Sequence, residues 1–573
     1  MNDIAIVTPG KRVSAWVAET DPKYAQAWLA SLPMADSGES AREIYQALYT
    51  LNRQEIDPAR RLELMDLYVA PVTTVVNGLQ GGLSRASFPL TPRRRQVADF
   101  VRQLYMEMAA GYKCTLKDLV KARFHWGRRQ HYPHVSQRAM AFLGELLLRA
   151  CQVYLPAPAG VWKDIHELYR FAETGEWLDV PIDPLPGEGT SPVTMRETYL
   201  RILMLALARP YQMPQGECLL VQRFLGKWAS KARIGADLRV ANPAACFQID
   251  LGADGPPLSL PREAPAQGVS LRLLNALELV RHTHAFVSRL NKGGPARLVD
   301  VGFEALDTTV HDVLQRLTRA WGFAARRQHS RLKRKGNVSL CAGLGAIHFF
   351  MNDQKPFAQE PDDEDRTVTL PASTTGEQVG ADDDQGDEAM DIALDRPLPE
   401  AAGKPQSSLP TPSELYRVDR WQIRDVSPRG LLLVGEGGTP VHVRVGELLG
   451  IQRADQIGTW SIAVARRLSN PAPGSVEMGI EFLAPRATPA AVCRSGPRQG
   501  CFPALSLPAV KSLKRPTSLL VERGLLAADE DVDLIEEGCP RQRVRILKRV
   551  ERTNGYEQWL FVQLLDEQDA RRS

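Results

Sequence analysis

Apolar residues recur at the spacing of amphipathic helices through the first half of the chain. Ile44, Leu48 and Leu51 fall on one helical face, and Ser40 with Glu43 offers a capping box at the start of that segment. Two short runs, "ACFQIDL" and "PPLSLP", indicate a small β excursion. Further helices are predicted over Ala59–Val76, Arg94–Ala110, Ser136–Tyr154, Met195–Leu207, Cys218–Lys231, Leu271–Leu290 and Thr308–Trp321. Residues 1–321 are therefore predicted to form an irregular, mainly helical domain.

The apolar period becomes two after Tyr416. The runs "WQIRD", "VHVRVG", "WSIAVA" and "VEMGIEF" each alternate apolar and polar residues, as half-buried strands do. Four such runs so close together are typical of a small antiparallel β-barrel. We expect "NVSLCAGLGAIHFFM", from Asn337 to Met351, to be its first strand. The predicted barrel domain covers residues 322–490.

A second β-rich domain is predicted at residues 491–573. Its clearest element is "VRILKRVERTNGYEQWLFVQL", two strand-like runs around an Asn554-Gly555 dipeptide. Asn-Gly favours a tight hairpin turn because both residues tolerate positive φ. The predicted fold class is therefore a multidomain α+β protein, with a helical region followed by two β-rich domains.

An acidic segment from Gln354 to Pro412 interrupts the first of these β domains. It is rich in Asp, Glu, Pro, Gly, Thr and Ser and nearly lacks aromatic residues, which predicts a disordered insertion. Its carboxylate clusters have the hard oxygen ligands that a divalent cation prefers, but neither cluster has the spacing of a calcium loop. We interpret the segment as a solvated acidic tether.

Composition and charge exclude several classes of protein. The 573 residues include 71 Lys and Arg against 67 Asp and Glu, so the net charge of +4 is nearly balanced and attraction to polyanions must come from local patches. The longest apolar run, "ILMLALA", is too short to span a bilayer, and the N-terminus lacks the apolar core of a signal peptide. A cytoplasmic location is expected.

Candidate chemistry is sparse. Eight cysteines are scattered without a CxxC pair, and reduced thiols are expected even for the closest two, Cys493 and Cys501. The histidines lack the spacing of a metal site, so no metal is predicted. No phosphate-cradling GxxxxGK[ST] motif and no GxSxG nucleophile elbow occurs, and the chain is therefore predicted not to be an enzyme.

Two motifs remain. The first is a basic stretch with seven ionisable side chains between Arg326 and Lys335, in which Arg327 and Arg331 have RxxxR spacing. Alone, such a stretch is most simply a solvated helix end that favours the C-terminal helix dipole. The second is Asp425-Val-Ser427-Pro-Arg-Gly430, a DxSxxG turn between two predicted strands.

Together the two motifs resemble those of the PilZ family, small antiparallel β-barrels that bind the bacterial second messenger cyclic di-GMP. The resemblance covers about residues 326–483, apart from the acidic insertion. It implies cyclic di-GMP as the ligand and no other cofactor. It also implies that arginines of a flexible arm close over the ligand while the turn presents an acceptor, a hydroxyl and an unobstructed backbone. The implied ligand-binding residues are Arg326, Arg327, Arg331, Asp425, Ser427 and Gly430.

Guanidinium groups suit this ligand because they can fork onto phosphate oxygens or the O6 and N7 acceptors of guanine, and can stack on its face. The chain departs from the family in one respect, because the acidic insertion separates the arginines from Asp425 far more widely than is usual. Loop closure costs only about 1 kcal/mol for such an insertion. An alternative register uses "RVDR" at Arg417–Arg420, which is one residue too short and falls within a predicted strand.

The sequence therefore predicts a bacterial cyclic di-GMP receptor that converts nucleotide binding into a change of domain arrangement or partner binding. The expected partners are the nucleotide and a protein that binds the helical region. An alternative is a PilZ-fold scaffold that binds a protein partner without nucleotide. The balanced charge and the adjacent acidic segment argue against a nucleic-acid partner.

Overall fold

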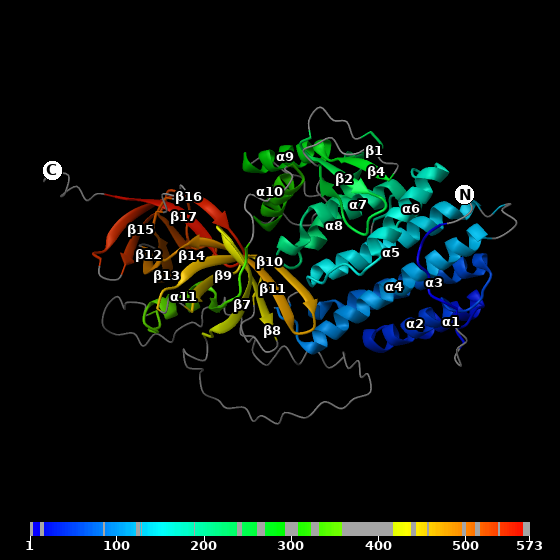
Figure 1. Cartoon of the computed structure of the whole chain (residues 1–573), viewed down its shortest axis with the longest axis horizontal. Coiled ribbons are helices and arrows are strands. Elements are labelled where there is room, and N and C mark those ends of the chain that lie inside the picture. Colours follow the sequence, from blue (N-terminus) through cyan, green and yellow to red (C-terminus); the bar gives the residue numbers. More distant parts are fainter. Residues whose placement is uncertain are drawn as a thin grey trace, which may run out of the picture. The chain divides into compact units, whose positions relative to one another are not determined.

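The computed structural model describes residues 4–11, 17–83, 86, 88–121, 127, 129–187, 189–237, 243–260, 270–292, 308–322, 332–357, 416–436, 443–454, 458–494, 500–509, 516–536 and 539–564. These residues divide into two compact units. The first contains elements α1 to α10 with β1 to β4, and the second contains β5 to β17 with α11 (Figure 1). No helix among the described residues is both long and apolar enough to cross a membrane.

The first unit is mainly helical. Its α-helices in the described residues are α1 (Pro22–Ser31), α2 (Ser37–Leu51), α3 (Pro58–Leu79), α4 (Pro92–Lys121), α5 (Tyr132–Gln152), α6 (Val161–Gly175), α7 (Met195–Leu207), α8 (Glu217–Trp228), α9 (Leu277–Asn291) and α10 (Thr308–Gly322). Helix α4 packs against α3 and α5 (Figure 1). Between α4 and α5, the rings of Tyr112 and Phe142 stack with their centroids 5.8 Å apart. The helix predicted at Met195–Leu207 is confirmed.

Helices α1, α2, α3 and α7 begin with a side-chain cap, but one predicted cap is wrong. Helix α2 begins at Ser37, because the Asp36 side chain accepts a hydrogen bond from the Glu39 amide. Ser40 therefore lies inside the helix, where its hydroxyl donates to the Pro33 carbonyl. A reciprocal capping box occurs instead at the start of α7, between Thr194 and Glu197.

A small antiparallel sheet completes the first unit. Its strands β1 (Arg233–Gly235), β2 (Cys246–Asp250), β3 (Leu258–Ser259) and β4 (Leu271–Asn275) lie in the order β1-β4-β2-β3. The predicted helix over Leu271–Leu290 is therefore wrong in its first turn and a half. Residues 271–275 pair between β1 and β2, and the Asn275 side chain then accepts from the Leu277 amide as α9 begins.

The second unit contains two closed antiparallel barrels. In the first, strands run in the order β7-β6-β9-β10-β11-β8, and pairing of β8 with β7 closes the ring, while β5 extends the edge of β7. The strands are β5 (Leu332–Lys333), β6 (Asn337–Ala342), β7 (Asp419–Ser427), β8 (Gly430–Glu436), β9 (Leu448–Arg453), β10 (Ser461–Ala472) and β11 (Ser475–Ala484). The predicted α+β fold class, with two β-rich domains after a helical region, is confirmed.

Two predicted strands of this barrel differ in the structure. In "VHVRVG", Val443 forms only an isolated bridge with Phe88, and the left-handed φ of +88° at Gly446 turns the chain before β9 begins. In "NVSLCAGLGAIHFFM", only β6 is a strand, and helix α11 (Leu344–Met351) follows it. Short apolar runs do not distinguish a buried strand from a buried helix by periodicity.

The second barrel closes in the order β12-β13-β14-β17-β16-β15. Its strands are β12 (Thr488–Arg494), β13 (Gly500–Leu507), β14 (Ser518–Val521), β15 (Asp531–Glu536), β16 (Gln542–Arg552) and β17 (Glu557–Gln563). The predicted hairpin at Asn554-Gly555 is confirmed by the pairing of β16 with β17.

Helix α11 joins the two barrels through one hydrophobic core. Ile347, which is fully buried, belongs to a cluster that includes Leu448 and Ile462 of the first barrel and Leu505 and Leu507 of the second. This burial explains why the run is continuously apolar. The contact between the two barrels therefore includes buried apolar side chains around α11 in addition to contacts at the surface.

A polar network also crosses this junction. Arg466 donates to Glu481 over 2.9 Å within the first barrel and to Glu551 of the second over 2.5 Å. Tyr556 donates to the other oxygen of Glu551 over 2.8 Å. Burial raises the pKa of Tyr556 well above its usual value, so the phenol remains a hydrogen-bond donor.

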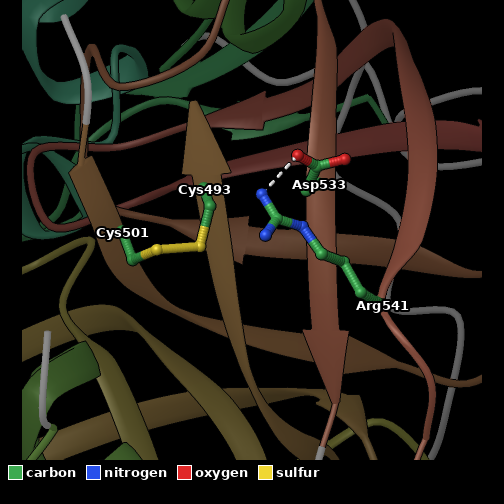
Figure 2. The surroundings of a disulfide bond; sticks show 4 residues. All are labelled: Cys493, Cys501, Asp533 and Arg541. Atoms are coloured by element: carbon green, nitrogen blue, oxygen red, sulfur yellow. Dashed lines mark hydrogen bonds and ion pairs between the residues drawn. A yellow bond between two sulfur atoms is a disulfide. The ribbon is translucent and has the colours of Figure 1, made fainter. Parts of the chain in front are cut away.

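The expectation that all cysteines are reduced is wrong for one pair. Cys493 and Cys501 form a disulfide between β12 and β13, where they lie directly opposite one another (Figure 2). The two cysteines meet because of the register of the β12–β13 hairpin, and the number of residues between them in the sequence did not show this register. The other six cysteines, all among the described residues, are free thiols.

Candidate functional site

The DxSxxG motif forms the turn between β7 and β8, as predicted. Ser427 pairs with Gly430, and the two residues between them are exposed. The Ser427 hydroxyl donates to the Gly430 carbonyl over 3.1 Å, which closes the turn with a side-chain hydrogen bond. The motif is therefore a tight hairpin at one end of the first barrel.

A β-bulge in β7 sets the direction of the motif's side chains. Before it, Trp421 is fully buried and Ile423 pairs with the buried Leu433. Arg424 is the extra residue, because Ile423 and Asp425 oppose consecutive residues of β8. Without the bulge, Asp425 would continue the inward series of Trp421 and Ile423.

After the bulge, Val426 takes the inward position and pairs with the buried Leu431. Asp425 and Ser427 then lie on the outer face of the barrel, and both are half-buried. Bulges commonly re-aim side chains next to functional sites. Here the bulge places a carboxylate and a hydroxyl on one accessible surface.

Gly430 is required by close packing. A Cβ atom at this position would lie 1.9 Å from the carbonyl oxygen of Ile480 on β11, the strand that pairs with β8. The backbone of the same turn is also tied to β11, because the Phe482 amide donates to the Arg429 carbonyl over 2.8 Å. Any larger side chain would separate the turn from the barrel.

Strand β5 brings the chain that follows the arginine motif to this turn. Leu332 pairs with Val426 and Lys333 pairs with Asp425, on the edge of β7 that β6 occupies further along. Residues directly opposite in an antiparallel pair share a face of the sheet. Lys333 therefore shares the outer face with Asp425 and Ser427.

Arg326, Arg327 and Arg331 lie outside the described residues. In the sequence, Arg331 immediately precedes Leu332. The second arginine of the RxxxR motif is therefore the neighbour in sequence of the strand that pairs with the DxSxxG segment. In the alternative register, Arg420 lies within β7 opposite Ser339.

The described surroundings are basic. Lys333, Arg334 and Lys335 are all exposed, and Arg429 is exposed within the turn itself. The Arg453 guanidinium lies 5.9 Å from the ring centre of Phe482, next to the same turn. Sequence reasoning named neither Lys333 nor Arg429 as a site residue. In the sequence, the only signals for these residues were that Lys333 lies within the basic stretch and that Arg429 lies within the DxSxxG motif.

This arrangement can bind a ligand that combines negative charge with hydrogen-bond donors. Exposed cations attract phosphate, while the Asp425 carboxylate and the Ser427 hydroxyl can accept from guanine nitrogen atoms. Among the residues that the structure describes, no group of three or more His, Cys, Asp or Glu side chains is placed to hold a metal ion.

Comparison with known proteins gives consistent matches along the chain. Three family models match in succession: "Cyclic-di-GMP receptor FimW, N-terminal domain" over residues 23–238, "Cyclic-di-GMP receptor FimW, middle PilZ domain" over 246–489, and "FimW C-terminal beta-barrel domain" over 490–564. The cyclic-di-GMP receptor FimW of Pseudomonas aeruginosa PAO1 is 28% identical over 565 residues, which cover 95% of this chain and 90% of that protein. No solved structure matches.

Proposed function

The chain belongs to the family of PilZ-domain cyclic-di-GMP receptors, and from this membership we propose that it binds cyclic di-GMP between its arginine arm and the β7–β8 turn. The observation that carries the proposal is the pairing of β5 with β7, which sets Lys333 opposite Asp425. Arg326, Arg327 and Arg331 come just before this strand. We also propose that the receptor is cytoplasmic and that its three domains cover residues 1–321, 322–490 and 491–573.

Each residue has a role that follows from its chemistry. The guanidinium groups of Arg327 and Arg331 hold phosphate oxygens and the guanine O6 and N7 edge, with Arg326 adding charge. Asp425 accepts from guanine N–H groups, and Ser427 adds a hydroxyl on the same face. No bond is made or broken in this proposal, so the chain acts as a receptor and not as a catalyst.

The arm is the route by which binding reaches the helical unit. Residues 323–331 connect α10 to β5 in the sequence. Both ends of that connection are anchored in their own units. Trp321 is fully buried and donates to the Met204 carbonyl over 3.0 Å, while β5 pairs with β7. Closing the arm on a ligand therefore restricts the link between the two units.

We place the protein partner on the helical unit, which has its own large hydrophobic core and carries none of the proposed nucleotide contacts except through the arm. Affinity capture of partners by the full chain, with and without cyclic di-GMP, tests this part. A partner retained in a nucleotide-dependent manner by residues of this unit is the expected result. Partners that contact only the barrels would contradict it.

Calorimetry with cyclic di-GMP tests the binding site. Replacing Arg331 or Asp425 by alanine should weaken binding at least tenfold, because each change leaves a charged or polar ligand group without its partner. Arg334→Ala is the matched control, since it removes an exposed arginine from the same basic stretch but not from the RxxxR motif. Equal losses for Arg331→Ala and Arg334→Ala would indicate non-specific attraction. No binding by the unmodified chain would favour the scaffold alternative.

A further inference from the structure

The disulfide between Cys493 and Cys501 joins two neighbouring strands of the second barrel. Its Cα atoms are 4.0 Å apart on neighbouring antiparallel strands, and the two cysteines are only eight residues apart in the sequence. Lasting disulfides are rare in the cytoplasm, where those that occur are usually transient or redox-sensing. The cytoplasmic setting rests on the proposed function, whereas the pairing of the two sulfur atoms does not.

The couple has one accessible sulfur. Cys501 is half-buried and Cys493 is 5% exposed, so a small reagent has access to the couple through Cys501. Among the free cysteines, burial raises the pKa of the thiols of Cys114, Cys151, Cys218, Cys246 and Cys341. A raised pKa lowers the thiolate fraction and thus the reactivity of these five thiols.

Charges beside Cys493 are balanced. Asp533 lies opposite Cys493 on β15, and its negative charge by itself would disfavour a thiolate there. The Arg541 guanidinium donates a hydrogen bond to this carboxylate over 2.8 Å (Figure 2). The ion pair offsets the repulsion that a Cys493 thiolate would meet.

The disulfide lies on the same face of the second barrel as the residues that pack against α11. Val492 and Ala504 face the interior of the second barrel, so Cys493 and Cys501, which alternate with them, lie on its outer face. Further along β13 on this same face, Leu505 belongs to the core that includes α11. The β12–β13 hairpin is therefore crosslinked at one end and packed against α11 at the other.

We propose that Cys493 and Cys501 are a reversible dithiol–disulfide couple, oxidised by exchange with a small disulfide such as glutathione disulfide, that stiffens the β12–β13 face supporting α11. This redox site acts in addition to nucleotide binding. Oxidation restrains the hairpin, and reduction releases it.

The exchange proceeds in two balanced steps. The Cys501 thiolate attacks one sulfur of glutathione disulfide, so that a Cys501–glutathione bond forms, the glutathione S–S bond breaks, and one glutathione thiolate leaves. The Cys493 thiolate then attacks the Cys501 sulfur and expels the second glutathione thiolate. The protein loses two electrons, glutathione disulfide gains two, and the two cysteine protons pass to the two glutathione thiolates.

Redox titration of the full chain tests the couple. The protein is equilibrated in buffers with a graded ratio of reduced to oxidised glutathione, quenched in acid, alkylated, and examined by peptide mass spectrometry. The expected result is a Cys493–Cys501 disulfide that rises from under a tenth to over nine-tenths of the molecules across the series. A pair that stays oxidised in the most reducing buffer, or reduced in the most oxidising one, overturns the proposal.

Single variants test the order of attack. Cys493→Ser should accumulate a glutathione adduct at Cys501, and Cys501→Ser should give at least tenfold less adduct at Cys493, because Cys493 is the more buried. The reverse order would overturn the assignment of Cys501 as the attacking thiol. Cys539→Ser is the matched control, since Cys539 is an exposed free thiol. A shifted titration midpoint in this control would mean that the couple involves a third cysteine and would overturn the pair assignment.

Hydrogen exchange tests the connection to α11. In the oxidised chain, amides of β12, β13 and residues 344–351 should exchange several-fold more slowly than in the reduced chain. Unchanged exchange in residues 344–351 would overturn the link to the junction. None of these measurements uses cyclic di-GMP, so a chain that fails to bind nucleotide but passes the redox titration rejects the proposed function alone.

Discussion

At the scale of single residues, the site depends on backbone geometry as much as on charged groups. Asp425 and Ser427 reach the outer face only because Arg424 is an extra residue in β7, and an ion pair between Arg424 and Glu477 of β11 holds that residue. Gly430 lets the turn approach β11, because it has no side chain. The effect of a substitution at Gly430 on stability can therefore be measured separately from any effect on ligand binding.

Gly430→Ala should destabilise the second unit by about 2 kcal/mol or more, in the upper range for overpacking, because the new methyl group meets a backbone oxygen that cannot move away alone. Urea unfolding measures the change. Gly479→Ala is the control, since a Cβ at this position of the same barrel would have an ordinary 3.5 Å contact with Arg467. Equal stability of the two variants would contradict the packing role of Gly430.

Glu447 is expected to make the stability of the barrel junction depend on pH. Its carboxyl lies close to the β16–β17 turn, because a Cβ on Gly555 would be 3.5 Å from Glu447 Oε1. Burial raises the pKa of Glu447 from 4.5 to about 7, and the charge of Arg444 only partly opposes this. The folded state thus favours the neutral carboxyl, so the stabilisation is complete below about pH 4.5 and is lost as the pH rises through 7.

The free energy of unfolding should therefore fall by up to about 3 kcal/mol between pH 5 and pH 7.5 through this group. Glu447→Gln keeps the shape but cannot ionise, and it should remove that part of the slope. Urea unfolding at both pH values, with hydrogen exchange of residues 443–454 to localise the effect, is the measurement. The same slope in both proteins would exclude Glu447 as its source.

At the scale of elements, α11 connects the two barrels. It is a single short helix, and its side chains belong to one hydrophobic core that also includes residues of both barrels. Both sides of the acidic insertion also end on it. The ring of Phe357 lies 5.5 Å from that of His348, and the ring of Tyr416 lies 5.0 Å from that of Phe349. The insertion therefore leaves and re-enters the fold at the same element.

Ile347→Ala should cost about 2–5 kcal/mol, since the side chain is fully buried and leaves a cavity at the junction. Because α11 contacts both barrels, hydrogen exchange should become faster in β9 and in β13 alike. Met351→Ala, at a half-buried position on the same helix, should cost less. Faster exchange confined to one barrel would show that α11 is not a shared core element.

At the scale of the whole molecule, charge is distributed unevenly. The chain is nearly balanced overall, but residues 354–412 contain 14 acidic and four basic residues. The proposed ligand is an anion and its site is basic. We therefore expect the insertion to compete electrostatically for the same cations, most strongly at low ionic strength.

Replacing residues 358–412 by a short Gly-Ser linker should tighten cyclic di-GMP binding several-fold at low salt and little at high salt, as measured by calorimetry. Thermal stability should change little, because both ends of the insertion are held on α11 and loop closure depends weakly on length. An insertion of unchanged length with its Asp and Glu residues replaced by Asn and Gln is the control. If only the shortened chain binds more tightly, length and not charge is responsible.

The sequence alone determined the elements that depend on interactions between residues close together in the chain. The hairpin at Asn554-Gly555, the helix at Met195–Leu207, the β7–β8 turn and the α+β class all follow from periodicity and turn chemistry, which act over a few residues. The resemblance to the PilZ family also follows from short motifs, because the RxxxR and DxSxxG patterns can be recognised in the sequence without the fold.

Only the tertiary structure decided what depends on pairing and packing between segments. Residues 271–275 are a strand because two other strands flank them, and residues 344–351 are a helix because two barrels bury them. Cys493 and Cys501 are close in the sequence, but they meet because of the register between β12 and β13, and the bulge at Arg424 likewise appears only when β8 is opposite β7. Periodicity along a single segment encodes neither the register between strands nor the packing of distant segments.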